Sequence, residues 1–325
     1  LFASSSSRFN PKGSANTITL QASTTGKNIF ASTSSSSPIN LTFDRSAANH
    51  GPGTWTFREQ ASTSALTITE GTIVAPSLLS ISGNYTNSGT FTHNSGTIFF
   101  TGSSITIGVS ATATSMIRDS AFNNLTLTGS GLKTLGAAAS TSNLTIENSA
   151  QLVAPSTYLS VSGNYTNNAT FSDNTGTLLF DGSGAQTIAG ILTDADASTS
   201  GFNNVTFLGT GAKTLTASAT STGNVVIQSG TSVSWPSRGY VSIAGNFTQS
   251  GTFDSNSGTT SFSGTSGSQT LSGTLTGEGA SKGQFRDVVF LGAATKSFGA
   301  NSASTSNFFI ESGSGAVTAP STLLI

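Results

Sequence analysis

Side chains that could do acid–base or metal chemistry are sparse in this chain of 325 residues, which has 13 Asp and Glu, 12 Lys and Arg and 2 His. A glycosidase needs two carboxylates that flank a cleft, and a Ca²⁺-dependent polysaccharide lyase needs several acids around the ion. The only close acidic pair is Asp194 and Asp196, in a polar and poorly repeated segment, where it could hold Ca²⁺. We expect solvated loop charges there, and neither an enzyme active site nor a cofactor.

Other chemistry-bearing residue types are isolated. His50 and His93 lie in different repeats, and each lacks a nearby second ligand type, so neither predicts a metal site or a general base. No nucleophile elbow of the Gly-x-Ser-x-Gly type sits between a strand and a helix. Because the chain has 0 Cys, it can form neither a disulfide nor a thiolate metal site.

The composition excludes two classes of partner. Charged residues make up 8% of the chain, against roughly 25% in a typical soluble domain, and the net charge is −1. Nucleic-acid grooves and polybasic membrane anchors both need clustered Lys and Arg, which are scattered here. No apolar run approaches the roughly 18 residues of a membrane-spanning helix. We therefore expect no nucleic-acid partner and no membrane insertion of this segment.

One phrase recurs along the chain and sets its organisation. It reads Ser-Gly-Asn-Tyr-Thr at 82–86 and at 162–166, and Ala-Gly-Asn-Phe-Thr at 244–248. The spacings between its glycines are 163 − 83 = 80 and 245 − 163 = 82. Repeats of this kind indicate an array of stacked structural units. We predict one continuous array over 1–325, with units at about 1–80, 81–160, 161–242 and 243–325, uncapped at both ends.

Each of these units subdivides into four shorter phrases with strand character. In the phrase Leu144-Thr145-Ile146 the apolar residues alternate with Thr, which is the period-two pattern of a half-buried strand. Gly, Asn and Ser between the short runs are turn formers. Coils of roughly 20 residues with short strands predict an all-β β-solenoid, a parallel β-helix, in which stacking buries a continuous core.

Four tandem immunoglobulin-like sandwiches are the alternative architecture, because the strand count and the turn spacing would also fit. Two features favour the solenoid. The unit is internally repetitive, which a sandwich does not require, and no linker separates one unit from the next. Polar segments at about 108–120, 190–200 and 273–283 interrupt the units, and we expect them to be loops on the scaffold.

Asn-x-Thr triplets recur at fixed positions of the repeat, and they have two readings. The candidate glycosylation sites are Asn84, Asn124, Asn143, Asn164, Asn204 and Asn246. The structural reading, which we favour, is that these Asn side chains form ladders at strand ends. Trp55 and Trp235 likewise could stack on a sugar, but they more simply fill core or turn positions.

The phrases at 79–87, 122–127 and 142–146 resemble repeats of very long bacterial surface proteins. They are also similar to the β-helical shafts of filamentous-haemagglutinin-like and autotransporter adhesins. This resemblance implies an extracellular or cell-surface location and a structural role, as the shaft of a filament or of a long surface protein. The expected partners are copies of the chain, or further repeats of a longer chain, stacked head to tail. The alternative function is an adhesin that binds cell-surface glycans through its variable loops.

Overall fold

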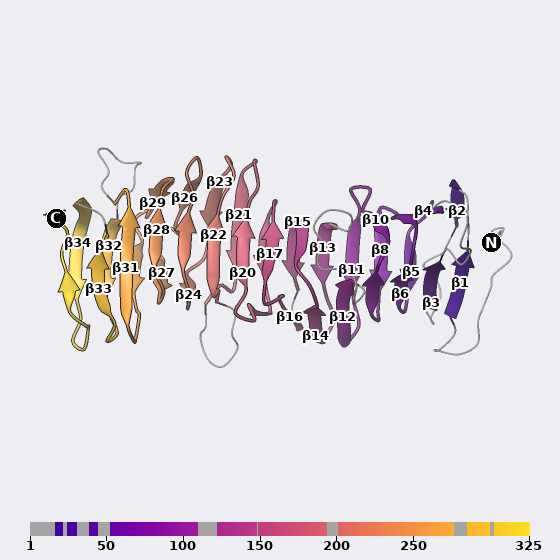
Figure 1. Ribbon diagram of the computed structural model, residues 1–325, viewed down its shortest axis with the longest axis horizontal. Helices are drawn as coiled ribbons and strands as arrows, with labels where there is room; N and C mark the ends of the chain where they lie inside the picture. The colour runs from indigo at the N-terminus through magenta and orange to yellow at the C-terminus, as the bar shows by residue number, and fades with distance from the viewer. Residues whose placement is uncertain are drawn as a thin grey trace. The chain divides into compact units, whose positions relative to one another are not determined.

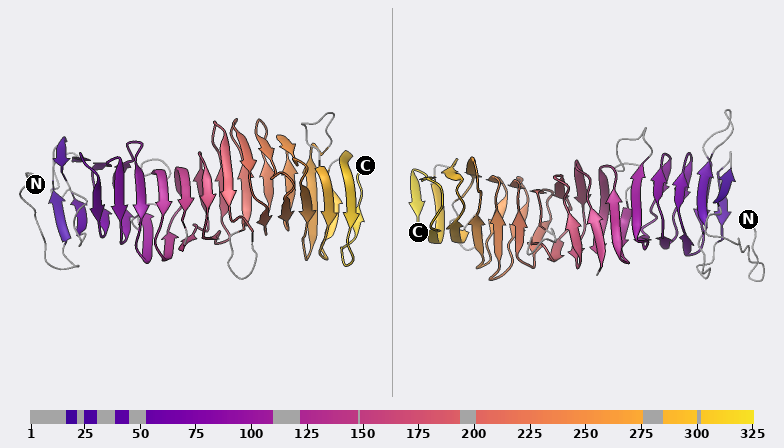
Figure 2. Two further views of the ribbon diagram at one scale, coloured as in Figure 1. Left: turned by 180° about the vertical axis from the view of Figure 1, so that it is seen from behind. Right: turned by 90° about the horizontal axis from the view of Figure 1, so that it is seen from below.

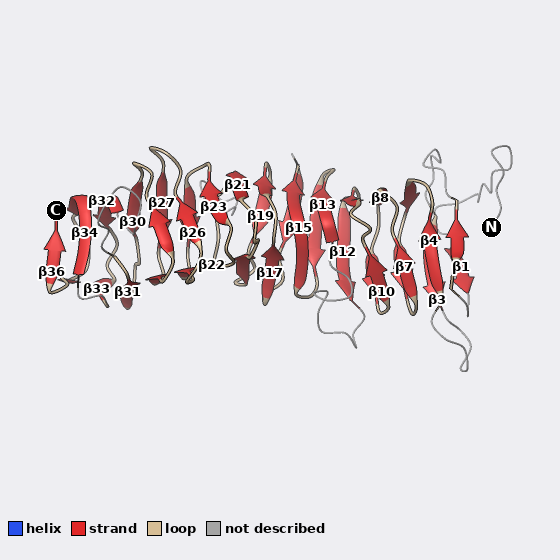
Figure 3. Cartoon of the chain, turned by 90° about the horizontal axis from the view of Figure 1, so that it is seen from above, coloured by secondary structure: helices blue, strands red, loops and turns tan. Residues whose placement is uncertain are grey.

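The computed structural model describes residues 17–21, 25–30, 39–44, 53–109, 122–147, 149–193, 201–275, 285–299 and 302–325. All regular structure in these ranges is β-strand, as the red arrows of Figure 3 show. Nothing within them is a helix that could cross a membrane. The chain divides into two compact units, Leu1–Pro155 and Ser156–Ile325, which we describe separately.

The first unit contains short strands that pair in parallel with the strand one turn further along the chain. Their bounds are β1 Thr17–Gln21, β2 Lys27–Ile29, β3 Asn40–Asp44, β4 Thr54–Phe57, β5 Ala61–Thr63, β6 Leu66–Ile68, β7 Thr72–Val74, β8 Leu78–Ile81, β9 Tyr85–Asn87, β10 Thr90–Thr92, β11 Thr97–Phe100, β12 Ser104–Val109, β13 Phe122–Leu127, β14 Gly131–Leu135, β15 Ala139–Ile146 and β16 Ala150–Val153.

The second unit is built in the same way, and its strands stand beside their neighbours from the next turn in the views of Figures 1 and 2. The bounds are β17 Tyr158–Val161, β18 Tyr165–Asn167, β19 Thr170–Ser172, β20 Thr177–Phe180, β21 Gln186–Gly190, β22 Asn204–Phe207, β23 Ala212–Leu215, β24 Ala219–Ser221, β25 Val225–Ile227, β26 Ser232–Ser234, β27 Tyr240–Ile243, β28 Phe247–Gln249, β29 Thr252–Asp254, β30 Thr259–Phe262, β31 Ser268–Gly273, β32 Phe285–Phe290, β33 Thr295–Phe298, β34 Ser302–Ile310, β35 Val317–Thr318 and β36 Thr322–Leu324.

Parallel pairing with a one-turn offset makes each unit a β-solenoid, which confirms the predicted fold class. One stack of the second unit passes from Leu159 through Leu178, Val205, Val225 and Phe247 to Leu271. These five steps cover 271 − 159 = 112 sequence positions, so the average turn length is 112 / 5 = 22.4. Turns are longer than predicted because some carry the polar insertions, as in the step from Leu178 to Val205. The two units together have about 13 turns in the part of the chain described.

A repeat is not a whole number of turns. Its length is 245 − 163 = 82, and division by the average turn length gives 82 / 22.4, or about 3.7 turns. Equivalent strands therefore fall on different faces within the second unit. The strand β17 joins the stack β17-β20-β22-β25, whereas its equivalent β27 joins the stack β24-β27-β30-β32. The four phrases of a repeat therefore do not correspond to four turns, because turns and sequence phrases have different lengths.

The core follows the alternation predicted from the sequence. In β6, β9 and β25 the outer residues of each triplet are buried and the middle residue is half-buried. Each complete repeat also contributes one cluster of four aromatic rings. In the second unit these rings are Tyr165, Phe171, Phe180 and Phe202, with centroids 5.9 to 6.1 Å from Tyr165. The aromatic residue of the recurring Gly-Asn-aromatic phrase is therefore the centre of a buried cluster.

Candidate functional site

The sequence candidates for metal binding are not brought together in the described residues. Asp194 and Asp196 lie outside those residues, as does His50. His93 closes a tight turn, where its Nδ1 accepts a hydrogen bond from the backbone N–H of Ser95 at 3.0 Å. No group of three or more His, Asp or Glu with metal-binding spacing occurs in the ranges that the structure describes.

The asparagines of the Asn-x-Thr triplets accept hydrogen bonds across the turns of the solenoid. The Oδ1 atoms of Asn84, Asn164 and Asn246 accept from backbone N–H groups one turn further along the chain, at 2.8 to 2.9 Å. Asn204 makes the same contact with the N–H of Asn224, and Asn143 donates from Nδ2 to Oδ1 of Asn124 at 2.7 Å. These contacts form the predicted ladder. Glycosylation at these positions stays a prediction.

Both tryptophans belong to the core. Trp55 is 3% exposed and Trp235 is 1% exposed, so neither presents a ring face to a sugar. The Nε1 of Trp235 donates to Oγ1 of Thr260 at 3.1 Å, which satisfies its polar edge inside the core. The variable segments at 108–120, 190–200 and 273–283 fall largely outside the described residues.

Three lysines form the most unusual polar sites of the structure. Lys133, Lys213 and Lys296 are each 0% exposed and occupy the same place in successive repeats, at spacings of 213 − 133 = 80 and 296 − 213 = 83. An ammonium group is almost never fully buried unless it is paired. Each of these lysines is therefore expected to find several acceptors inside the solenoid.

Backbone carbonyl oxygens supply those acceptors. The Nζ of Lys213 donates to Gly182 O at 2.7 Å, in the preceding turn, and to Gly211 O at 2.8 Å. Lys296 donates to Gly264 O at 3.1 Å, and to the carbonyls of Gly292, Ala294 and Leu291. Lys133 donates within its own turn, to Gly129 O at 2.7 Å and Gly131 O at 3.2 Å.

A buried glutamine stands beside the lysine in the two later repeats. Gln186 is paired in register with Lys213, and Gln269 with Lys296. The Nε2 of Gln186 donates to Val161 O at 2.8 Å and to Gly163 O at 2.6 Å, while its Oε1 accepts from Gly182 N at 2.9 Å. Each Gln–Lys pair therefore ties together three successive turns of the solenoid.

The electrostatics of these sites point to structure rather than reaction. Burial lowers the pKa of Lys213, and the carboxylate of Asp181 opposes that shift. Burial also lowers the pKa of Lys133 and of Lys296. A reactive amine needs access to a substrate, but these Nζ atoms are enclosed by carbonyl oxygens that they hold in place. The arrangement supplies side-chain hydrogen bonds that connect neighbouring turns of the solenoid.

Sequence reasoning missed these lysines because it considered charges only as possible surface patches. The available signal was the alternation in Lys133-Thr134-Leu135, which places Lys133 on the same face as the buried Leu135. The same pattern recurs as Lys213-Thr214-Leu215. A lysine that returns at an inward position of every complete repeat is a sequence signature of a buried ammonium.

Cavities in the second unit are small and apolar. One is lined by Phe202, Val205 and Trp235 among others, and one by Phe285, Phe298 and Leu323 among others, and each measures about 10 Å³. That volume admits about one water molecule.

The chain was compared with family models, with curated proteins and with solved structures, and none of them matches it.

Proposed function

We propose that this protein is a structural shaft, a length of an extracellular filament or of a long cell-surface protein, built by end-to-end stacking of β-coils. The observation that carries the proposal is the uninterrupted parallel register from Leu159 to Leu271, in which each turn uses the previous turn as its template. A solenoid of this kind adds length by adding turns, and each turn contacts only its neighbours.

Two further features support a mechanical role. The Gln–Lys pairs and the asparagine ladder add side-chain bonds along the stacking direction, so that neighbouring turns are held by more than their strand pairing. The side chains that remain polar are mainly Ser, Thr and Asn, with only 8% charged residues. Such a surface stays hydrated without charge, which suits a protein exposed to variable salt outside a cell.

Electron microscopy of the native material tests the proposal most directly. A shaft predicts continuous thin rods, which antibodies raised against this chain should decorate along their length on intact cells. Compact isolated particles, or antibody access only after the cells are broken, would contradict the proposal. The matched control is the same antibody serum after adsorption with the purified protein.

A further inference from the structure

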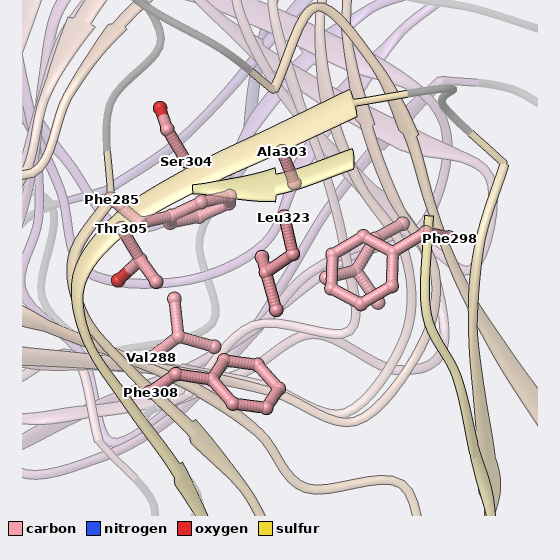
Figure 4. Close-up of a pocket in the computed structure, with 9 residues that line it drawn as sticks. Phe285, Val288, Phe298, Ala303, Ser304, Thr305, Phe308 and Leu323 are labelled. Carbon is pink, nitrogen blue, oxygen red and sulfur yellow. The ribbon is translucent and has the colours of Figure 1, made fainter. Parts of the chain in front are cut away.

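One copy of a recurring phrase departs from the others at its outward positions. The phrase Phe-Asn-Asn stands at 122–124 and at 202–204, whereas the copy at 285–287 reads Phe-Arg-Asp. Phe285 and Val288, on either side of the charged pair, are buried and line a small cavity of the core (Figure 4). Arg286 is exposed and Asp287 is half-buried. The solenoid does not require these charges, because asparagines occupy the same places in the earlier copies.

A second exposed arginine lies just before β27, in a turn that ordinarily takes glycine. Residues 236–239 form a tight turn, which is closed by a hydrogen bond from Gly239 N to Pro236 O at 3.2 Å. Arg238, the third residue of this turn, has a φ of +56°, in the left-handed region that favours glycine. Backbone strain of this kind is found mainly at functional sites. The turn therefore presents an arginine where a glycine would cost less.

The two arginines lie close together on one sheet of the second unit. Strand β27 pairs with β30, and β30 pairs with β32, so that Tyr240, Thr259 and Asp287 lie side by side in successive turns. Arg238 and Arg286 lie just before the first and the last of these residues, which separates them by two strand spacings, or about 10 Å. Among the described residues of the second unit they are the only exposed Lys or Arg, and neither guanidinium has a partner there.

The neighbouring groups on this face suit a sugar. Tyr240 is 44% exposed, and its ring offers an apolar face with a polar tip, on which the C–H face of a sugar can stack. Asp287 Oδ1 accepts a hydrogen bond from Asn307 Nδ2 at 2.6 Å, which fixes an amide–carboxylate pair beside the ring. The other nearby carboxylate, that of Asp254, accepts from Asn256 N at 2.8 Å. Both carboxylates are thus occupied, whereas the two guanidinium groups lack a counter-charge.

We propose that Arg238, Tyr240 and Arg286 form a binding site for an acidic polysaccharide, a chain of uronic-acid sugars. The guanidinium groups bind the sugar carboxylates, for which their planar fork is suited, while one sugar ring stacks on Tyr240. Because the arginines lie about 10 Å apart, several linked sugars are needed to reach both. The site is independent of the proposed shaft and of the variable segments, since its three residues belong to the strands and turns of the second unit.

Isothermal titration calorimetry of the full chain with sodium polygalacturonate, a homopolymer of a uronic acid, tests the site. Binding should weaken as salt is raised, because salt screens exposed charges. Methyl-esterified polygalacturonate has the same sugar rings without the charge, and it should bind more weakly by about tenfold or more. Polyphosphate, a polyanion without sugar rings, should bind more weakly than polygalacturonate, because it has nothing to stack on Tyr240.

Variants that copy other repeats separate binding from folding. Arg286→Asn restores the Phe-Asn-Asn phrase, and Arg238→Asn introduces a residue type that tolerates the left-handed region. The double variant should weaken binding of polygalacturonate by about tenfold or more without lowering the urea midpoint. Tyr240→Leu should weaken binding by about threefold or more, whereas Tyr158→Leu at the same place of the preceding repeat should not. Both leucine variants copy Leu78.

Three results would overturn the inference: no binding of polygalacturonate at low salt, equal effects of the two leucine variants, or polyphosphate binding as tight as that of polygalacturonate. Far-UV circular dichroism checks the folding of each variant. Should Arg286→Asn fail to fold, Arg286→Gln, which removes the charge and keeps most of the side chain, takes its place. The proposed shaft is judged separately by microscopy of native material, so rods without polygalacturonate binding would remove only this site.

Discussion

Substitution of Gly190 by Ala should destabilise the second unit strongly, whereas the same substitution at Gly108, near the end of the corresponding strand β12 of the first unit, should not. The two glycines lie in corresponding strands but one register position apart: Gly190 is opposite Asn167, whereas Gly108 is opposite Thr86 and its neighbour Val109 is opposite Asn87. Gly190 has a φ of +97°, and a Cβ placed on it would collide with the backbone oxygen of Asn167. Gly108 lies outside the left-handed region, and its Cβ would meet no atom of the described chain closer than Thr106 Cγ2 at 4.0 Å.

The magnitude follows from two contributions. A non-glycine residue in the left-handed region costs roughly 1–2 kcal/mol. Relief of the collision must also separate the strands where Ile191 N donates to Asn167 O at 2.6 Å and Asn167 Nδ2 donates to Ile191 O at 2.8 Å. Each lost bond costs about 1 kcal/mol. Gly190→Ala should therefore lower the free energy of unfolding by about 3–4 kcal/mol.

Urea unfolding followed by far-UV circular dichroism, and by the fluorescence of the buried Trp235, measures this loss. Gly273, with a φ of +105° and a collision with Gln249 O, is an internal replicate and should behave like Gly190. Gly108→Ala should leave stability unchanged or raise it by about 0.5 kcal/mol, because Ala loses less backbone entropy than Gly on folding. If Gly108→Ala and Gly190→Ala cost the same within about 0.5 kcal/mol, the argument from backbone approach is wrong.

Three further predictions concern polar side chains. Tyr165 is 0% exposed and its hydroxyl has no hydrogen-bond partner among the described residues. Tyr165→Phe, which copies Phe247 of the next repeat, should therefore leave stability at pH 7 unchanged or raise it by about 1–3 kcal/mol in thermal unfolding. Burial raises the pKa of Tyr165, so the folded state keeps a proton that the unfolded state loses near pH 10. This group should make stability fall above pH 10 by up to about 1.4 kcal/mol per pH unit, and Tyr165→Phe should remove that contribution while leaving the similar one of the buried Tyr85. Lys213→Met should lower the free energy of unfolding by about 1–3 kcal/mol in urea, because the loss of its charge-assisted hydrogen bonds outweighs the gain from no longer burying a charge. The control Lys27→Met, on the exposed strand β2, should cost less than about 0.5 kcal/mol. Asn246→Ala should cost about 1 kcal/mol by the same assay, since Thr270 N loses its acceptor, and an unchanged midpoint would refute the ladder.

The architecture could be predicted from the sequence because solenoid packing depends on local alternation. A triplet such as Leu144-Thr145-Ile146 fixes which side chains point inward, and stacking of like phrases fixes the core. The number of turns could not be predicted, because the phrases mark strands and not turns. The strand β15, Ala139–Ile146, pairs along most of its length with β13, so that one strand spans two phrases.

The polar sites were only partly predictable for a different reason. The Asn ladder depends on asparagines that recur at the same positions of each repeat, and these positions can be read directly from the sequence. The buried ammonium groups depend on where carbonyl oxygens point, and this is set by turns such as Gly209, whose φ is +82°, and Gly292, whose φ is +69°. The residue types of a phrase do not determine the direction of the backbone carbonyl groups at its turns. The inward positions of the lysines could be predicted from the sequence pattern, but the carbonyl oxygens that accept their hydrogen bonds could not.

The mismatch between repeat and turn bears on the choice between a shaft and a one-sided binding surface. A feature that recurs once per repeat moves to another face each time, because a repeat spans about 3.7 turns and not four. Within the second unit, Asn164 precedes β18 in the stack β18-β21-β23, whereas Asn246 precedes β28 in the stack β25-β28-β31. Lys213 and Lys296 are separated in the same way, on β23 and β33.

Side chains that recur once per repeat are therefore distributed around the solenoid, whereas Asn-x-Thr sites of different phrases can share one stack, as Asn204 of β22 and Asn246, next to β28, do. A glycan-binding platform made from a repeated residue would need neighbouring copies on one face, one or two turns apart. A shaft gains from the opposite arrangement, since ties that recur once per repeat, such as the Gln–Lys pairs, are shared among its faces. The geometry of the repeat thus favours the shaft. The adhesin alternative would require the variable segments to differ from one another in what they bind, and not the repeat itself to bind.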